Sequence, residues 1–207
     1  MTATFYFDLA SPDSYIAAER VLSVLPGPAA WTPVAAGGLA DAGAGSRDPE
    51  RWWIEGRARE RLERRARELG LQELRWPDPF PFDSTLALRV ATYARQIGRV
   101  VAFAQAAFRQ AFAGGHSLAD EDAVLIAAAA CEMHPAAVLK GAAMRSVIAE
   151  LDDATAAART SGVTAVPAVV VPRAGAGGAA AVFHGEASLA EAGACMQSLA
   201  MRAASGA

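Results

Sequence analysis

The sequence predicts an α/β protein in which strands lie near both ends of the chain and helices fill the middle. Three observations support this prediction. Residues 4–35 read as strand, helix and strand; residues 48–160 show helical periodicity; and residues 166–202 read as two strands and a closing helix. The chain has 207 residues, of which 53% are hydrophobic and 20% charged, so it can bury a substantial core.

The N-terminal part predicts a strand–helix–strand unit. Residues 4–8 are aromatic and β-prone, and the segment directly after them has the features of a helix start. Ser11 can cap that helix, and Pro12 suits its first position. The prolines at 26 and 28 end the helix, and residues 31–35 are expected to form the second strand.

The middle of the chain predicts helices separated by short breaks. Residues 37–48 are glycine-rich and loop-like, and the prolines in residues 76–82 exclude regular structure there. The expected helices span residues 49–70, 84–96, 100–113, 120–133 and 135–151, with a last short one from 152 or 153 to 161.

The C-terminal part returns to strands. Residues 166–172 predict a buried strand with Pro167 near its start, where proline is tolerated, and residues 180–184 predict its hairpin partner. A helix is expected over residues 187–202. The order βαβ, helices, ββα predicts a thioredoxin-like sheet with a large all-helical insertion. Residues 1–47 and 161–207 would form the thioredoxin-like domain, and residues 48–160 the insertion.

Composition excludes several classes of function. The net charge of −3 argues against a broad nucleic-acid interface. The chain has neither a secretory signal nor 18 consecutive apolar residues, so we expect no membrane contact and a cytoplasmic location. The two cysteines, Cys131 and Cys195, form no CxxC motif, and the three histidines are scattered, so neither dithiol chemistry nor a metal site is expected.

Two segments are candidates for chemistry. Residues 11–14, Ser-Pro-Asp-Ser, open a helix directly after a strand, and a helix N-terminus favours a thiolate, phosphate or carboxylate. The alternative is that Ser11 is an N-cap and nothing more. In the second segment, a cis Val166–Pro167 bond would leave the backbone of Val166 available to an extended peptide, unless Pro167 is an ordinary edge-strand proline.

Four segments together resemble a known family: FYFDLASPDSY, FPFDSTLALR, SGVTAVPAVVV and FHGEASL. They resemble the 2-hydroxychromene-2-carboxylate isomerase family, which is related to kappa-class glutathione transferases and to DsbA-like proteins. The resemblance covers roughly residues 3–200. It implies a glutathione-dependent enzyme that forms a homodimer and acts on a small conjugated aromatic acid. In such isomerases the thiol adds to a conjugated carbon, a bond rotates, and the thiol leaves.

The resemblance also implies roles for individual residues. Ser11 would face the sulfur of glutathione and favour its thiolate, and Val166, before cis Pro167, would pair with the glutathione backbone. The implied γ-glutamyl site is the turn His184, Gly185, Glu186 and Ala187. The implied substrate pocket contains Ser46, Arg47 and Phe82. Arg47 would hold a substrate carboxylate through a bidentate contact; the alternative is an exposed loop arginine near Asp48.

Several positions depart from the family pattern, among them Arg61 and Asp83, and two departures concern glutathione directly. Asp13 stands where the family usually has an aromatic residue, and Ala187 stands where an acid usually grips the γ-glutamyl ammonium. A carboxylate at position 13 would oppose thiolate formation by about one pKa unit. Three functions therefore stay open: a glutathione-dependent isomerase, a kappa-type glutathione transferase or peroxidase, and a non-catalytic thioredoxin-like module that has lost glutathione.

Overall fold

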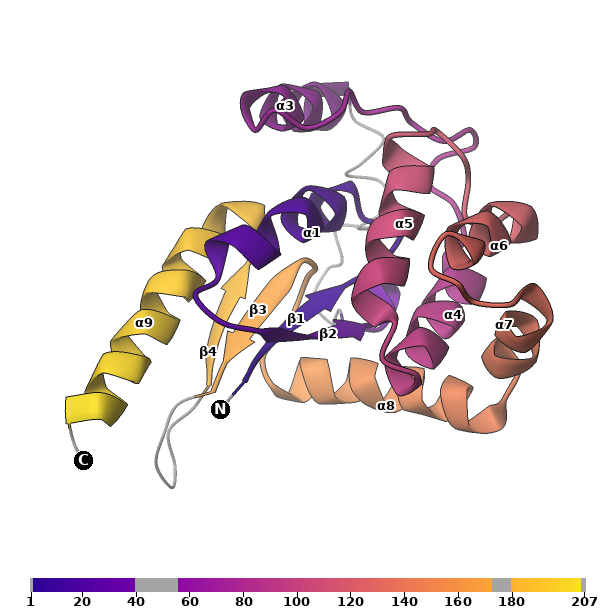
Figure 1. Cartoon of the computed structure of the whole chain (residues 1–207). Coiled ribbons are helices and arrows are strands. Elements are labelled where there is room, and N and C mark those ends of the chain that lie inside the picture. The colour runs from indigo at the N-terminus through magenta and orange to yellow at the C-terminus, as the bar shows by residue number, and fades with distance from the viewer. Residues whose placement is uncertain (1, 40–55, 173–179, 206–207) are drawn as a thin grey trace.

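The computed structural model describes residues 2–39, 56–172 and 180–205, which form a sheet covered by helices on both faces (Figure 1). The four strands are β1 (Ala3–Phe7), β2 (Ala29–Pro33), β3 (Ala168–Val171) and β4 (Ala181–His184). Their order in the sheet is β2-β1-β3-β4, with β1 and β2 parallel and the other neighbours antiparallel. This mixed sheet confirms the predicted α/β, thioredoxin-like fold.

Alternation along β1 divides the core into two parts. Phe5 and Phe7 point to one face of the sheet together with Trp31 of β2, and the rings of Phe5 and Trp31 meet edge to face at 4.9 Å. Tyr6 points to the other face, where it packs in a smaller cluster that includes Ala158. The period of two expected of a strand thus places the aromatic side chains of β1 in two separate cores.

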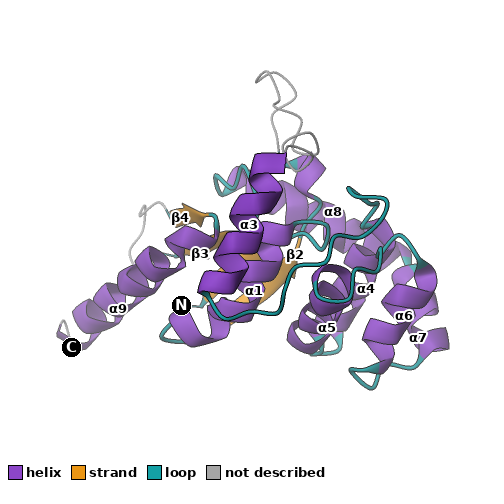
Figure 2. Cartoon of the chain, turned by 90° about the horizontal axis from the view of Figure 1, so that it is seen from above, coloured by secondary structure: helices purple, strands orange, loops and turns teal. Residues whose placement is uncertain are grey.

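The helices lie above and below this sheet. Besides α1 (Pro12–Val24), they are α3 (Gly56–Glu68), α4 (Thr85–Gln96), α5 (Val100–Phe112), α6 (Glu121–Ala129), α7 (Pro135–Ala142), α8 (Arg145–Thr160) and α9 (Leu189–Ser205). Figure 1 shows α1 and α9 over one face of the sheet and α8 under the other. In Figure 2, seen from above, α3 crosses over α1. The N-terminal end of α1 therefore lies close to the insertion between β2 and β3.

The helix expected over residues 120–133 ends at Ala129, and the largest differences from the sequence prediction lie between α7 and α8. The expected helix over residues 135–151 ends at Ala142, and α8 then runs without interruption through Asp152 and Asp153. The prediction of a helix start at these aspartates was wrong because both are exposed on the surface of α8 and cap nothing. The extended backbone of Met144 begins α8 instead, without a side-chain cap. An N-cap without a polar side chain leaves no sequence signal.

The described helices include none that is both long and apolar enough to cross a membrane. In the same part of the chain, no group of three or more His, Cys, Asp and Glu side chains is placed to hold a metal ion.

We expect Gly141→Ala to destabilise the protein, because a Cβ on Gly141 of α7 would lie 2.6 Å from the ring of Tyr93 on α4. Such overpacking costs about 1–3 kcal/mol of unfolding free energy, measurable by urea denaturation. Gly37→Ala is the control, since its Cβ would meet no atom within 4 Å. Equal unfolding free energies of the two variants would contradict this prediction, because they would show that α4 and α7 can move apart to accommodate the new Cβ without loss of stability.

Candidate active site

Ser11 stands at the N-terminus of α1 and caps it. Its Oγ accepts a hydrogen bond from the Ser14 N–H at 3.1 Å, and its side chain is 5% exposed. A hydroxyl that accepts one bond still has its own proton to donate. Among the described residues no acceptor receives that proton. The capping interpretation is therefore confirmed, and it leaves Ser11 able to donate to a ligand atom at the positive end of the helix.

Asp8, at the end of β1, fixes the position of this helix start. Its Oδ1 accepts from the Ala10 N–H at 2.9 Å and from the Ser84 Oγ at 2.8 Å, while its Oδ2 accepts from the Ala36 N–H at 2.9 Å. Burial raises the pKa of Asp8, and the three hydrogen bonds act in the opposite direction. The carboxyl group thus joins three chain segments around Ser11. The sequence analysis did not single out Asp8. Its position directly after the aromatic residues of a predicted strand could have indicated a buried, hydrogen-bonded carboxylate.

The bond between Val166 and Pro167 is cis, as expected. Because Tyr6 pairs with Ala168 in the antiparallel β1–β3 ladder, Pro167 lies at the end of β1 from which α1 departs. The Pro167 carbonyl accepts from the Gly185 N–H at 2.8 Å. Within the described part of the chain, the N–H and C=O of Val166 have no hydrogen-bond partner. They are available to an extended ligand, as the edge of a strand would be.

His184 holds the segment that leads to this bond. Its Nε2 accepts from the Thr164 N–H at 3.1 Å, which requires the Nε2 to carry no proton. Burial lowers the pKa of His184 and so favours that neutral form. The ring of His184 is therefore engaged with the protein backbone. A direct contact between this ring and a cofactor stays a prediction.

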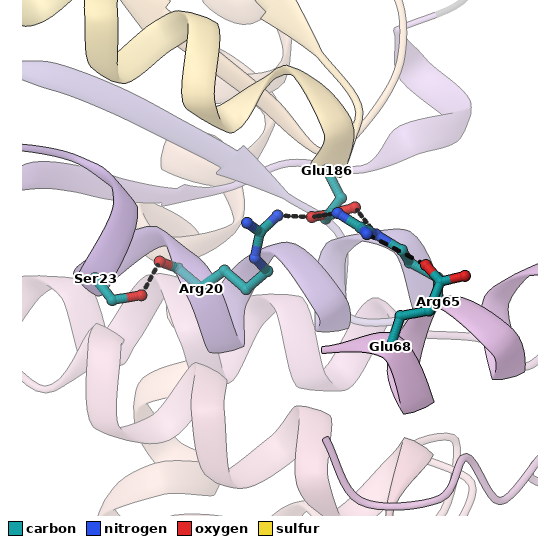
Figure 3. A network of polar contacts seen from close by, with 5 residues as sticks. All are labelled: Arg20, Ser23, Arg65, Glu68 and Glu186. Carbon is teal, nitrogen blue, oxygen red and sulfur yellow. Dashed lines mark hydrogen bonds and ion pairs between the residues drawn. The ribbon is translucent and has the colours of Figure 1, made fainter. Parts of the chain in front are cut away.

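Glu186 is the centre of an ion-pair network that joins three elements (Figure 3). Its carboxylate, 6% exposed, receives Arg65 of α3 through Nε at 2.9 Å and Nη2 at 3.1 Å, and it also pairs with Arg20 of α1. Arg65 makes a further, longer contact with Glu68 at 3.4 Å. Both oxygens of Glu186 are thus occupied by arginines, and the network ties α3 to α1 and to the turn after β4.

A pocket of about 380 Å³ lies beside this network. It is lined by Asp13, Arg61, Leu62, Arg64, Arg65, Glu68, Gly185, Glu186 and Ala187. The structure therefore brings Gly185, Glu186 and Ala187 of the expected turn together with Asp13 of α1, whereas His184 does not line this pocket. Burial raises the pKa of Asp13 to about 6, and the charge of Arg61 acts against that rise.

The three residues expected at the substrate pocket have different outcomes. Phe82 is buried, and its ring packs at 6.0 Å from Phe80 and 6.3 Å from Phe112. It is therefore part of an aromatic cluster that supports the start of α4. Ser46 and Arg47 lie outside the described residues, so their roles stay predictions.

Residues 42–192 match the family of DSBA-like thioredoxin domains. The chain belongs to this family. A 2-hydroxychromene-2-carboxylate isomerase matches with a TM-score of 0.81 and 19% identity, over 100% of both chains. A probable DsbA oxidoreductase from Streptomyces coelicolor matches with a TM-score of 0.72 and 19% identity, over 93% of this chain and 88% of that one.

A cytosolic disulfide reductase, DsbM from Pseudomonas aeruginosa, shares the fold as well, with a TM-score of 0.67 and 14% identity over 98% and 99% of the two chains. No curated protein sequence matches the chain. At 14–19% identity these similarities show a shared fold, and the similar proteins have different named activities.

The cysteines of this DSBA-like chain lie away from the start of α1. Cys131 is buried just after α6, and Cys195 lies on α9; both are free thiols. The group presented at the N-terminus of α1 is the hydroxyl of Ser11. Because neither position 11 nor α1 has a cysteine, the start of α1 cannot carry out thiol–disulfide exchange with a thiol of its own.

We expect Glu186→Gln to lower the unfolding free energy by about 2 kcal/mol, because it removes the buried partner of two arginines. Urea denaturation measures this loss. The control is Glu132→Gln, whose exposed pair with Arg99 should contribute less than about 1 kcal/mol. A double-mutant cycle with Arg65→Ala should show coupling, and simple additivity of the two changes would contradict the network.

We expect acid to destabilise the wild type more than the variant His184→Gln. Since the pKa of His184 is lowered in the folded state, the unfolded chain takes up a proton first, and stability is lost as pH falls below about 6.5. Glutamine can still accept from the Thr164 N–H but does not titrate at the amide. The measurement is the difference in unfolding free energy between the two proteins at pH 8 and pH 5.

Asp13 also titrates in this pH range, but the wild type and His184→Gln both contain it. Its contribution to the unfolding free energy therefore cancels when the two proteins are compared. The exposed His116 provides the control variant His116→Gln, which should follow the wild type at both pH values. If His184→Gln also follows the wild type, the ring of His184 does not support the segment before Pro167.

Proposed function

We propose that this DSBA-like protein is a glutathione-dependent isomerase resembling 2-hydroxychromene-2-carboxylate isomerase, acting on a small conjugated aromatic acid by transient thiol addition. The observation that carries the proposal is that two features lie at the same end of β1: a serine hydroxyl at the N-terminus of α1, and the backbone of Val166, which no described residue hydrogen-bonds. The first suits a thiolate, and the second suits a short peptide. Glutathione is a ligand that has both a thiol and a short peptide backbone.

The residues of the site fit the three parts of glutathione. Ser11 has a proton to donate to the sulfur, Val166 has an N–H and a C=O for the peptide part, and the turn Gly185–Ala187 opens on a pocket with charges of both signs. When bound, glutathione would supply a nucleophilic sulfur that can add to a conjugated carbon and leave it again. The turn would approach the γ-glutamyl end through Gly185 and Ala187, since the carboxylate of Glu186 is engaged by Arg20 and Arg65.

The protein would contribute orientation and electrostatics to the reaction. Ser11 and the positive end of α1 stabilise negative charge on a sulfur placed there. Arg47 would hold the carboxylate of the substrate so that its conjugated carbon faces the sulfur. We further propose a homodimer in the cytoplasm, where glutathione is kept reduced.

A transferase of the kappa type would use the same Ser11 and Val166, and the fate of glutathione distinguishes it. An isomerase leaves the glutathione concentration unchanged while the substrate changes geometry; a transferase consumes glutathione and forms a stable adduct. The charge of Asp13 near the site favours the third candidate, a binding module without glutathione. Calorimetric titration with millimolar glutathione separates that module from both enzymes.

We expect Ser11→Ala to bind glutathione with a smaller thiolate fraction, because the hydroxyl donor to the sulfur is lost. The ultraviolet absorbance of the thiolate measures this fraction. Stability should fall by only about 1 kcal/mol through the lost N-cap. The control Ser23→Ala lies on the same helix and removes only a hydrogen bond to the Arg20 carbonyl. An unchanged thiolate fraction in Ser11→Ala would exclude Ser11 from the sulfur site.

A further inference from the structure

The pocket beside the Glu186 network contains a carboxylate that accepts no hydrogen bond from the described residues. Three carboxylates line this pocket, and two of them, on Glu68 and Glu186, are paired with Arg65. The third belongs to Asp13 of α1, which no described residue hydrogen-bonds. Burial disfavours the charged form of this carboxylate, so a cation placed beside it would stabilise that form.

The positive groups of the pocket come from α3. Arg64 is exposed, lines the pocket, and forms neither an ion pair nor a hydrogen bond with another described residue. Arg61 also lines the pocket, but its charge compensates Asp13 less than burial destabilises it. A guanidinium group with unused N–H groups binds a carboxylate well. The pocket thus offers a carboxylate on α1 and a guanidinium on α3, the complement of a ligand group with an ammonium and a carboxylate.

This pocket borders both parts of the candidate active site. Asp13 follows Ser11 by two residues in the first turn of α1. Gly185 also lines the pocket, and its N–H donates at 2.8 Å to the carbonyl of Pro167, the residue directly after Val166. Three residues of extended chain span about 10 Å at most. A tripeptide bound at Ser11 and Val166 can therefore place one of its ends in the pocket.

We propose that this pocket selects the α-amino acid group at the γ-glutamyl end of glutathione, with Asp13 receiving its ammonium and Arg64 its carboxylate. This inference rests on the proposed function and names the residues that distinguish glutathione from other thiols. Ala187 carries no charge, and the carboxylate of Glu186 is occupied by arginines. Asp13 is therefore the carboxylate that can hold an ammonium group between α1 and the turn after β4. A thiol without an α-amino acid group loses both contacts.

A comparison of glutathione with glutaryl-Cys-Gly tests the role of Asp13. This analogue keeps the thiol, both peptide bonds and the carboxylate, and it lacks only the amino group. Calorimetric titration at pH 7.5, above the pKa of about 6 to which burial raises Asp13, gives both dissociation constants. We expect the wild type to bind glutathione about 10- to 100-fold more tightly, because the analogue cannot donate to the carboxylate. In Asp13→Asn this preference should fall about five- to tenfold, since the amide keeps the size without the charge.

The variant Arg64→Gln separates the two charges of the amino acid group. Both ligands carry the carboxylate that Arg64 would hold, so this variant should weaken both by the same factor, about two- to fivefold, and keep the preference. Asp122→Asn is the matched control for Asp13→Asn. Asp122 has the same first-turn position in α6 and does not line the pocket, so its variant should bind both ligands like the wild type.

Each outcome decides a separate point. Equal affinity of the wild type for the two ligands overturns the role of Asp13, and this comparison needs no variant. An unchanged preference in Asp13→Asn overturns it as well. A changed preference in Arg64→Gln overturns the assignment of the carboxylate to Arg64. If glutathione gives no binding heat with the wild type, the proposed function fails together with this inference; binding without preference overturns the inference alone.

Discussion

The arrangement of the candidate site depends on the buried carboxyl group of Asp8. Its three hydrogen bonds come from the residue before Ser11, from the segment after β2, and from the residue before α4. A buried carboxyl group is stable only when such donors surround it. The same requirement fixes the three segments relative to one another. The end of β1 thereby determines where α1 begins and how the aromatic cluster of Phe80, Phe82 and Phe112 approaches it.

The charges near the site fall into two sets with different roles. Glu186 forms ion pairs with Arg20 of α1 and Arg65 of α3. It therefore stabilises the packing of these two helices against the turn after β4. Asp13 lies in the same pocket and accepts no hydrogen bond from the described residues, and burial raises its pKa to about 6. Two carboxylates of the same pocket thus differ in charge compensation according to the partners that the fold gives them. The difference is one of environment, since the two side chains have the same chemistry.

Proteins with different named activities share the fold of this DSBA-like chain. In this chain the start of α1 offers the positive end of a helix dipole, and function depends on the residues placed at such a site more than on the fold. The residue there is Ser11, and the two cysteines of the chain lie elsewhere. A hydroxyl can orient and stabilise a sulfur but cannot form a disulfide. The reactive thiol must therefore come from a cofactor under the function we propose.

The sequence by itself determined the order of elements, a capping residue at Ser11 and the lack of a CxxC motif, whereas the expected cis bond before Pro167 rested also on the family resemblance. These follow from local chemistry: alternation in the strands, an N-cap followed by proline, and the cysteine positions. Only the tertiary structure decided the roles of Asp8, Asp13, Glu186 and His184. The partners that distinguish them are distant along the chain, as Ser84 is from Asp8 and Arg65 is from Glu186, so no spacing in the sequence reveals whether such a group will be paired. The helical insertion supplies Ser84 to Asp8 and Arg65 to Glu186, so the packing of this insertion against the sheet decides how the carboxylates of the candidate site are paired.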